Sequence, residues 1–103
     1  MSGIRVTLTD SIGTVLGDSE SNPVIMDNHL NRPEIKSSLK NGIGKSIRFS
    51  STVSKELLYL AKTYRMHKKT YVIRGALELS LINDIIFSPL MSFEIISFFI
   101  LFE

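Results

Sequence analysis

The segment from Lys45 to Ala61, KSIRFSSTVSKELLYLA, changes its hydrophobic period halfway along. Over residues 45–50 apolar side chains alternate with polar ones, and this period of two is typical of a short strand. From Val53 onward apolar side chains recur every three to four residues, which predicts an amphipathic helix over residues 51–65. The apolar stripe of that helix consists of Val53, Leu57, Leu60, Ala61 and Tyr64. The sequence therefore predicts a strand that leads directly into a helix.

A second helix is predicted over residues 70–83, after a short polar connection at residues 66–69. Its apolar side chains cover most of the helix circumference, and they are Val72, Ile73, Ala76, Leu77, Leu79 and Leu81. One small neighbouring helix cannot cover so much apolar surface. We therefore expect this second helix to be buried between several neighbours.

Residues 1–44 differ in composition and are interpreted as a flexible or partly ordered N-terminal extension. Residues 4–9 alternate apolar with polar side chains, which predicts a short strand, and the following SIGTVLG is compatible with a small hairpin. The remainder is rich in Asp, Ser, Asn, Pro and Gly, which favours loops over regular structure. One short helical turn is expected near residues 33–39.

Residues 84–103 form an apolar C-terminal tail. Thirteen of the eighteen residues from Ile85 to Phe102 are apolar, and they include five of the six Phe of the chain. Three interpretations are open: a further helix packed on a dimer, a segment that binds a protein partner, or a membrane anchor. Glu94 argues against the anchor, because a carboxylate at the bilayer centre costs about 2.5–3.5 kcal/mol. We therefore rank membrane association last.

The charge of the chain is unevenly distributed. The net charge is only +2, but residues 45–75 carry eight basic side chains against Glu56 alone. Residues 1–44 and residues 76–103 are each net acidic. Such a basic block is typical of a surface that meets a polyanion, although a solvated basic face gives the same pattern.

The sequence lacks the residue sets typical of catalysis, and we expect neither enzymatic activity nor a cofactor. No cysteine is present, which excludes disulfides and thiolate metal sites and suits a reducing cytoplasm. His29 and His67 are far apart in sequence, so no metal site is expected. The motif GIGKS at residues 42–46 has the wrong glycine spacing for a phosphate-binding loop. The first ten residues lack the apolar core of a secretory signal.

The order of strand, helix, short turn and helix over residues 45–83 resembles the ribbon-helix-helix family of DNA-binding proteins, the Arc/MetJ/CopG type. The resemblance is carried by the strand IRFS, by the apolar stripe of the first predicted helix and by the sequence TYVIRGALELSLI. In the last of these the matching residues are Thr70, Val72, Ile73, Arg74, Ala76 and Leu77. The resemblance implies a mainly α fold, with one strand and two helices per chain, and an intertwined homodimer.

The resemblance also implies roles for individual residues. In that family the two strands of the dimer form a ribbon, which fits the major groove of DNA. Base contacts are then expected from Ser46, Arg48 and Ser50. Phosphate contacts are expected from Lys45, Lys68, Lys69 and Thr70. The dimer core is expected to contain Ile47, Phe49, Val53, Leu57, Leu60, Ala61, Tyr64, Val72, Ile73, Ala76 and Leu77.

The resulting hypothesis is a dimeric, sequence-specific protein that binds double-stranded DNA in the cytoplasm, as a transcriptional repressor or a plasmid-maintenance regulator. Antitoxins and conjugation accessory proteins share the fold that the resemblance implies. In an antitoxin the tail would bind a protein partner. A tail-anchored membrane protein is the remaining alternative.

Overall fold

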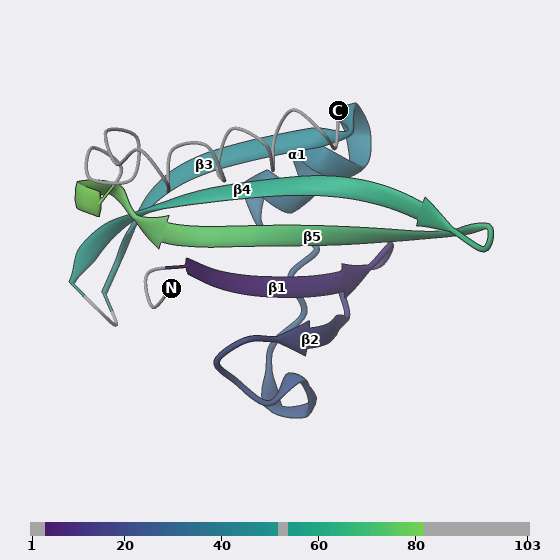
Figure 1. Ribbon diagram of the computed structural model, residues 1–103, viewed down its shortest axis with the longest axis horizontal. Helices are drawn as coiled ribbons and strands as arrows, with labels where there is room; N and C mark the ends of the chain where they lie inside the picture. The colour runs from purple at the N-terminus through teal and green to yellow at the C-terminus, as the bar shows by residue number, and fades with distance from the viewer. Residues whose placement is uncertain (1–3, 52–53, 82–103) are drawn as a thin grey trace, which may run out of the picture.

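The computed structural model describes residues 4–51 and 54–81, and within them the chain forms a five-stranded antiparallel sheet with one α-helix (Figure 1). The strands are β1 (Ile4–Asp10), β2 (Val15–Asp18), β3 (Ile43–Ser50), β4 (Lys55–Met66) and β5 (Lys69–Glu78). Helix α1 spans Pro33–Asn41, and two 3-10 helices span η1 (Pro23–Ile25) and η2 (Leu79–Leu81). The strand order across the sheet is β2-β1-β5-β4-β3, and α1 packs against β3, β4 and β5.

The expected mainly α, ribbon-helix-helix fold is wrong, because the chain forms strands where both helices were predicted. β4 replaces most of the first predicted helix, and β5 replaces most of the second. Along β4 the side chains of Leu58 and Leu60 lie on one face, and those of Leu57 and Tyr59 on the other. Both faces of β4 are thus partly apolar. Along the sequence, the apolar residues of the two faces together recur every three to four positions, which is also the spacing along one face of a helix. The many β-branched and aromatic residues of β4 and β5 favour the extended conformation.

The turn at His67 and Lys68 explains why residues 66–69 were predicted to connect two helices. These two residues join β4 to β5 between the paired residues Met66 and Lys69. Both have a positive φ, 51° for His67 and 67° for Lys68. Two positive φ values are characteristic of the type I′ hairpin turn, which usually carries Asn and Gly. Since His-Lys is not a signal for this turn, the polar segment MHKK looks like a loop between helices.

Residues 4–44 do not form a flexible arm, because they contribute β1, β2, α1 and the first residues of β3 to the fold. β1 lies between β2 and β5, and it pairs with β5 from Ile4↔Leu77 to Asp10↔Tyr71. The expected boundary between residues 44 and 45 falls inside β3. The short strand, the small hairpin and the helical turn expected in this part are present as β1, the β1–β2 pair and α1, and the strand expected at residues 45–50 is present within β3.

The apolar core between α1 and the sheet is small. Its fully buried cluster consists of Ile35, Ala61 and Val72. α1 approaches β3 so closely that a Cβ on Gly44 would lie 2.1 Å from the carbonyl oxygen of Glu34. Only a residue without a side chain therefore fits at this position of β3.

The residues expected to form a dimer core are divided between the two faces of the sheet. The single chain buries Ala61, Val72, Ala76 and Leu77. It half-buries Leu57, Leu60, Tyr64 and Ile73. The face of β3 opposite α1 carries Ile47 and Phe49, which are 56% and 65% exposed. Val53 lies outside the described residues. Since neither predicted helix exists, a shared four-helix core does not form.

Among residues 4–51 and 54–81, no helix combines the length and the apolar character that crossing a bilayer requires. The apolar tail at residues 84–103, with the three interpretations given for it, lies outside the described residues.

Candidate anion-binding site

The basic block of residues 45–75 does not form one patch on the folded chain. Lys55 forms an ion pair with Glu78, with 3.0 Å between Nζ and Oε1. Lys45 and Lys62 lie on the face of the sheet opposite α1. The charge that suggested a polyanion partner is therefore distributed over two faces and both ends of the sheet.

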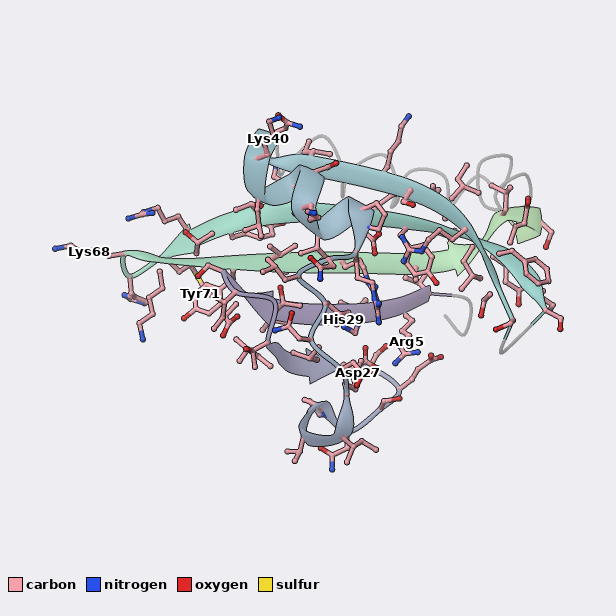
Figure 2. The ribbon with its side chains drawn as sticks, turned by 180° about the vertical axis from the view of Figure 1, so that it is seen from behind. Arg5, Asp27, His29, Lys40, Lys68 and Tyr71 are labelled. Atoms are coloured by element: carbon pink, nitrogen blue, oxygen red, sulfur yellow. The ribbon has the colours of Figure 1, made fainter. Side chains whose placement is uncertain are left out.

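The helix N-terminus that was expected to position the phosphate contacts is absent from the described residues. No helix begins at Thr70, which lies in β5 and pairs with Arg65 of β4. Lys68 and Lys69 lie at the end of the β4–β5 hairpin, far along the sheet from the segment that carries Arg5 (Figure 2). The positive end of a helix dipole, on which that expectation depended, is therefore absent from this hairpin.

The expected base contacts lie on one face of β3, as their alternation predicted. Ser46, Arg48 and Ser50 all belong to the side that faces α1. The guanidinium of Arg48 donates to the Ser46 hydroxyl at 3.1 Å and is also bonded to α1. Because β3 pairs with β4 of the same chain and its Arg48 face packs against α1, the fold does not support the mechanism of DNA reading that assigned these residues.

Glu34 is the centre of a charged cluster that the sequence analysis missed. Its carboxylate is fully buried and accepts hydrogen bonds from two arginines of different strands. Arg48 binds both oxygens, with 3.2 Å between Nη2 and Oε2, and Arg74 donates from Nη1 to Oε2 at 3.1 Å. Glu34 is the second residue of α1, after Pro33, where a negative charge is stabilised by the helix dipole.

Tyr59 of β4 lies between these two arginines. The guanidinium carbon of Arg48 is 4.0 Å from the ring centroid, and that of Arg74 is 5.0 Å away. Both distances are within the range of cation–π interactions. The ring therefore contacts both cations on the α1 side of the sheet.

Arg74 connects the cluster to the other half of the sheet. It is only 5% exposed, and its Nη2 donates to the Thr7 hydroxyl of β1 at 3.3 Å. Thr7 in turn donates to Asp18 of β2 at 2.6 Å, and Asp18 pairs with Arg5 at 3.0 Å. The Nε of Arg74 is buried and has no hydrogen-bond partner among the described residues. One network of hydrogen bonds thus links β3, α1, β5, β1 and β2, and the Nε donor of Arg74 lies near its middle.

A pocket of 530 Å³ opens onto this network. The residues that line it come from the β1 strand, the loop after η1, the start of α1, the β3–β4 end and β5. They are Arg5, Met26, His29, Arg32, Arg48, Phe49, Ser50, Ser51, Tyr59 and Arg74. Figure 2 shows His29, which follows η1, near the strand β1 that carries Arg5. Folding therefore brings four guanidinium groups to one cavity.

The electrostatics of the pocket favour ionised carboxylates and a neutral histidine. Burial by itself raises the pKa of Glu34, but the hydrogen bonds from Arg48 and Arg74 outweigh it and hold the pKa below its usual value. Burial and the nearby charge of Arg74 lower the pKa of His29. The Nδ1 of His29 lies 2.8 Å from the carbonyl oxygen of Asp27, which only accepts, so Nδ1 carries the proton. The Nε2 atom of the neutral ring is then an acceptor.

Asp18 is ionised for a related reason. Burial would raise its pKa, but the donors Arg5 and Thr7, with two backbone amides, lower the pKa to about 2. The carboxylates of the network, those of Glu34 and Asp18, are therefore already paired with arginines of the protein. Among residues 4–51 and 54–81, no group of three or more acidic or histidine side chains is arranged to hold a metal ion.

Arg48 and Ser50 are the residues of this pocket for which the sequence analysis expected ligand contacts, although with another ligand. Arg74 was interpreted through the family resemblance as part of a helix. Glu34, Tyr59, Arg5 and the residues after η1 were not predicted, because they converge only through the sheet order and no spacing in the sequence announces that. Comparisons of the chain with protein-family models, with curated proteins and with solved structures found no match.

Proposed function

We propose that this protein binds a small organic anion, through a carboxylate or phosphate group, in the arginine-lined pocket between α1, β1, β3 and β5. The observation that carries the proposal is Arg74. Its side chain is almost fully buried, it lines the pocket, and its Nε donor has no partner among the described residues. A buried donor without a partner costs free energy that a bound acceptor recovers.

The charge balance of the pocket supports an anionic ligand. Arg48 and Arg74 share one carboxylate, that of Glu34. Arg5 is bonded to Asp18, and Glu20 lies 3.6 Å from it at the surface. Arg32, the fourth guanidinium, forms no ion pair within the described part of the chain. Positive charge therefore remains in excess, and guanidinium groups match the planar, two-oxygen geometry of carboxylate and phosphate.

The shape and the remaining lining indicate what else the ligand carries. A volume of 530 Å³ falls within the range of pockets that bind small molecules. Tyr59 and Met26 contribute apolar surface beside the arginines. A ligand with an acidic group and an apolar or ring portion satisfies both parts of the lining. The proposal is one of binding without catalysis, in the cytoplasm, where a chain without cysteine is at no disadvantage.

Isothermal titration calorimetry with benzoate, phenyl phosphate and the neutral benzyl alcohol tests this proposal. We expect at least one of the two anions to bind and the alcohol not to bind. Arg32→Ala, which leaves the Glu34 cluster intact, is expected to weaken anion binding about tenfold, the loss of one charge-assisted hydrogen bond. Arg65→Ala, at the exposed end of β4, is the matched control and should bind as the wild type does. Equal losses in the two variants, or equal binding of the alcohol, contradict the proposal.

A further inference from the structure

The two outer strands of the sheet differ in how well they are protected from further pairing. β2 has only four residues, and its pairing with β1 contains a register shift. β3 has eight residues and pairs with β4 in unbroken register. It contains no proline, and no strand among the described residues pairs with its outer edge (Figure 1). A long, regular and unpaired edge is a template for another strand.

The direction of the backbone groups of β3 follows from one hydrogen bond. The amide of Thr63 in β4 donates to the carbonyl of Gly42 at 3.0 Å, so this carbonyl points toward β4. In an antiparallel ladder the N–H and C=O of one residue point to the same side, and successive residues alternate. The even-numbered residues of β3 therefore bond to β4, and Lys45, Ile47 and Phe49 direct their backbone groups outward.

The side chains of these outward residues are also open to contact. Ile47 is 56% exposed and Phe49 is 65% exposed, both on the face opposite α1. Lys45 is the one charged residue of β3 on that face. The same three residues thus combine backbone groups that have no strand partner among the described residues with exposed side chains, two of which are apolar, and both features favour strand pairing.

We propose that two copies of this chain pair antiparallel through the outer edges of β3, with the twofold axis at Ile47, to form one continuous ten-stranded sheet. Registers centred on Lys45 or on Arg48 would place identical charges directly opposite each other, which is unfavourable. A register centred on Ser46 would place Ile47 opposite Lys45. Centred on Ile47, the pairing sets Ile47 against its own copy, Lys45 against Phe49, and Ser46 against Arg48.

This dimer differs from the intertwined helical dimer that the sequence suggested. It involves no exchange of helices, and the α1 face of each copy keeps its own pocket. An isologous contact of this kind closes on itself, since the same edge of both copies is consumed. The pairing rests on backbone groups and does not depend on whether the pocket binds an anion.

Site-specific cross-linking tests the register. Because the chain contains no cysteine, an introduced cysteine is the only thiol that can react. Residues that directly oppose each other in a hydrogen-bonded antiparallel pair have Cα atoms about 5.5 Å apart, a separation that a disulfide spans. The full chain carrying Ile47→Cys is expected to form a disulfide-linked dimer under mild oxidation. The control is Val24→Cys in η1, where Val24 is 88% exposed, and it should cross-link at least about tenfold more slowly. Equal rates would overturn the proposal.

The mass in solution provides the second measurement. Sedimentation equilibrium of the wild type is expected to give twice the chain mass of 11.6 kDa. Ile47→Lys places four like charges around the axis and is expected to give the monomer mass, with an unchanged circular dichroism spectrum. Val24→Lys should remain dimeric. A monomeric wild type, or a dimer in which Ile47→Cys cross-links no faster than Val24→Cys, excludes pairing through β3.

Discussion

The two faces of the sheet have opposite chemistry, although the same strands build both. Toward α1, β3 and β5 present Arg48 and Arg74, whose guanidinium groups share the buried carboxylate of Glu34. Away from α1, β3 presents Ile47 and Phe49, which stay largely exposed. Since successive residues of a strand point to opposite faces, β3 supplies a candidate ligand site with one set of side chains and a candidate association edge with the other.

The comparison shows where the stability of the fold is concentrated. On the α1 face the fully buried apolar cluster is limited to Ile35, Ala61 and Val72, and much of the remaining interior is a network of paired charges. A buried charge is tolerated only while its partner is present. We therefore expect substitutions in the network to affect folding strongly, whereas substitutions of exposed residues, on the opposite face or in exposed ion pairs, affect folding little.

The largest effect is expected for Glu34→Ala. The variant leaves Arg74, which is 5% exposed, without its carboxylate, and it removes the group that neutralises Arg48. Removing one partner of a buried pair costs about 3–5 kcal/mol in the free energy of unfolding. Urea denaturation followed by circular dichroism measures the change.

The control for this substitution is Glu56→Gln, because Glu56 is exposed on β4. It should change the free energy of unfolding by no more than about 0.5 kcal/mol. If Glu34→Ala does not fold, Glu34→Gln, which keeps the shape and one acceptor, takes its place in the comparison. A loss at Glu34 as small as that at Glu56 would show that the charged network does not stabilise the α1 face.

A smaller effect is expected for Gly44→Ala, which tests the close approach of α1 to β3. The new Cβ would lie 2.1 Å from the carbonyl oxygen of Glu34 and 2.8 Å from the amide of Ser38, so the helix must shift. Forcing an extra carbon into a packed interior costs about 1–3 kcal/mol. Gly75→Ala is the matched control in β5, since no described atom lies within 4 Å of its Cβ position.

The control has an expected sign of its own. Alanine restricts the unfolded chain more than glycine does, so Gly75→Ala should raise the free energy of unfolding by about 0.4–1 kcal/mol. Thermal unfolding of both variants distinguishes them by the direction of the Tm shift. Shifts of the same sign would mean that α1 does not pack on Gly44 in the way described.

The pH dependence of stability tests the neutral state of His29. Burial and the charge of Arg74 lower its pKa in the folded protein, whereas the unfolded chain titrates near the ordinary value of 6.5. The unfolded state therefore binds more protons below pH 6.5, and the stability present above that pH is lost as the pH falls. The free energy of unfolding, measured at pH 7.5 and at pH 5.5, should decrease across this interval.

Substitution identifies the source of that decrease. His29→Gln should reduce the difference between the two pH values. Asp18 does not interfere, because its folded pKa of about 2 places its contribution at lower pH. A pH dependence unaffected by His29→Gln contradicts the assignment.

The sequence predicted local features better than their assembly, and β3 shows why. The alternation over residues 45–50 is visible without any neighbour, so the strand was predicted correctly. Its two faces were assigned the wrong way round, because Ile47 and Phe49 were expected in a core and are exposed, whereas the face of Arg48 packs against α1. In β4 the same reasoning failed, since apolar residues on both faces satisfy a helical period as well. The hairpin between β4 and β5 was not predicted, because His67 and Lys68 at its turn lack the usual preference for positive φ.

The candidate site could not be predicted from the sequence for a related reason. Arg48 and Glu34 are separated by fourteen residues, and Arg74 and Glu34 by forty, in segments whose order in the sheet no local pattern reveals. The return of β5 to a position beside β1 brings Arg74 to Thr7, and it is a consequence of the whole topology. Charge density alone could not distinguish basic residues bonded inside the fold from those on its surface.

The smallest effect is expected for Lys55→Gln, which removes an exposed ion pair, the one with Glu78, for comparison with the buried pairs of Glu34. Lys55 and Glu78 are 3.0 Å apart, as close as the atoms that pair Arg74 with Glu34, but their side chains are 54% and 30% exposed. Because solvent screens such a pair, the free energy of unfolding should fall by about 0–1 kcal/mol, and less in 1 M salt. Urea denaturation at low and high salt measures this. A loss near that of Glu34→Ala would mean that burial does not decide which ion pairs stabilise this protein, and the contrast between the two environments would no longer hold.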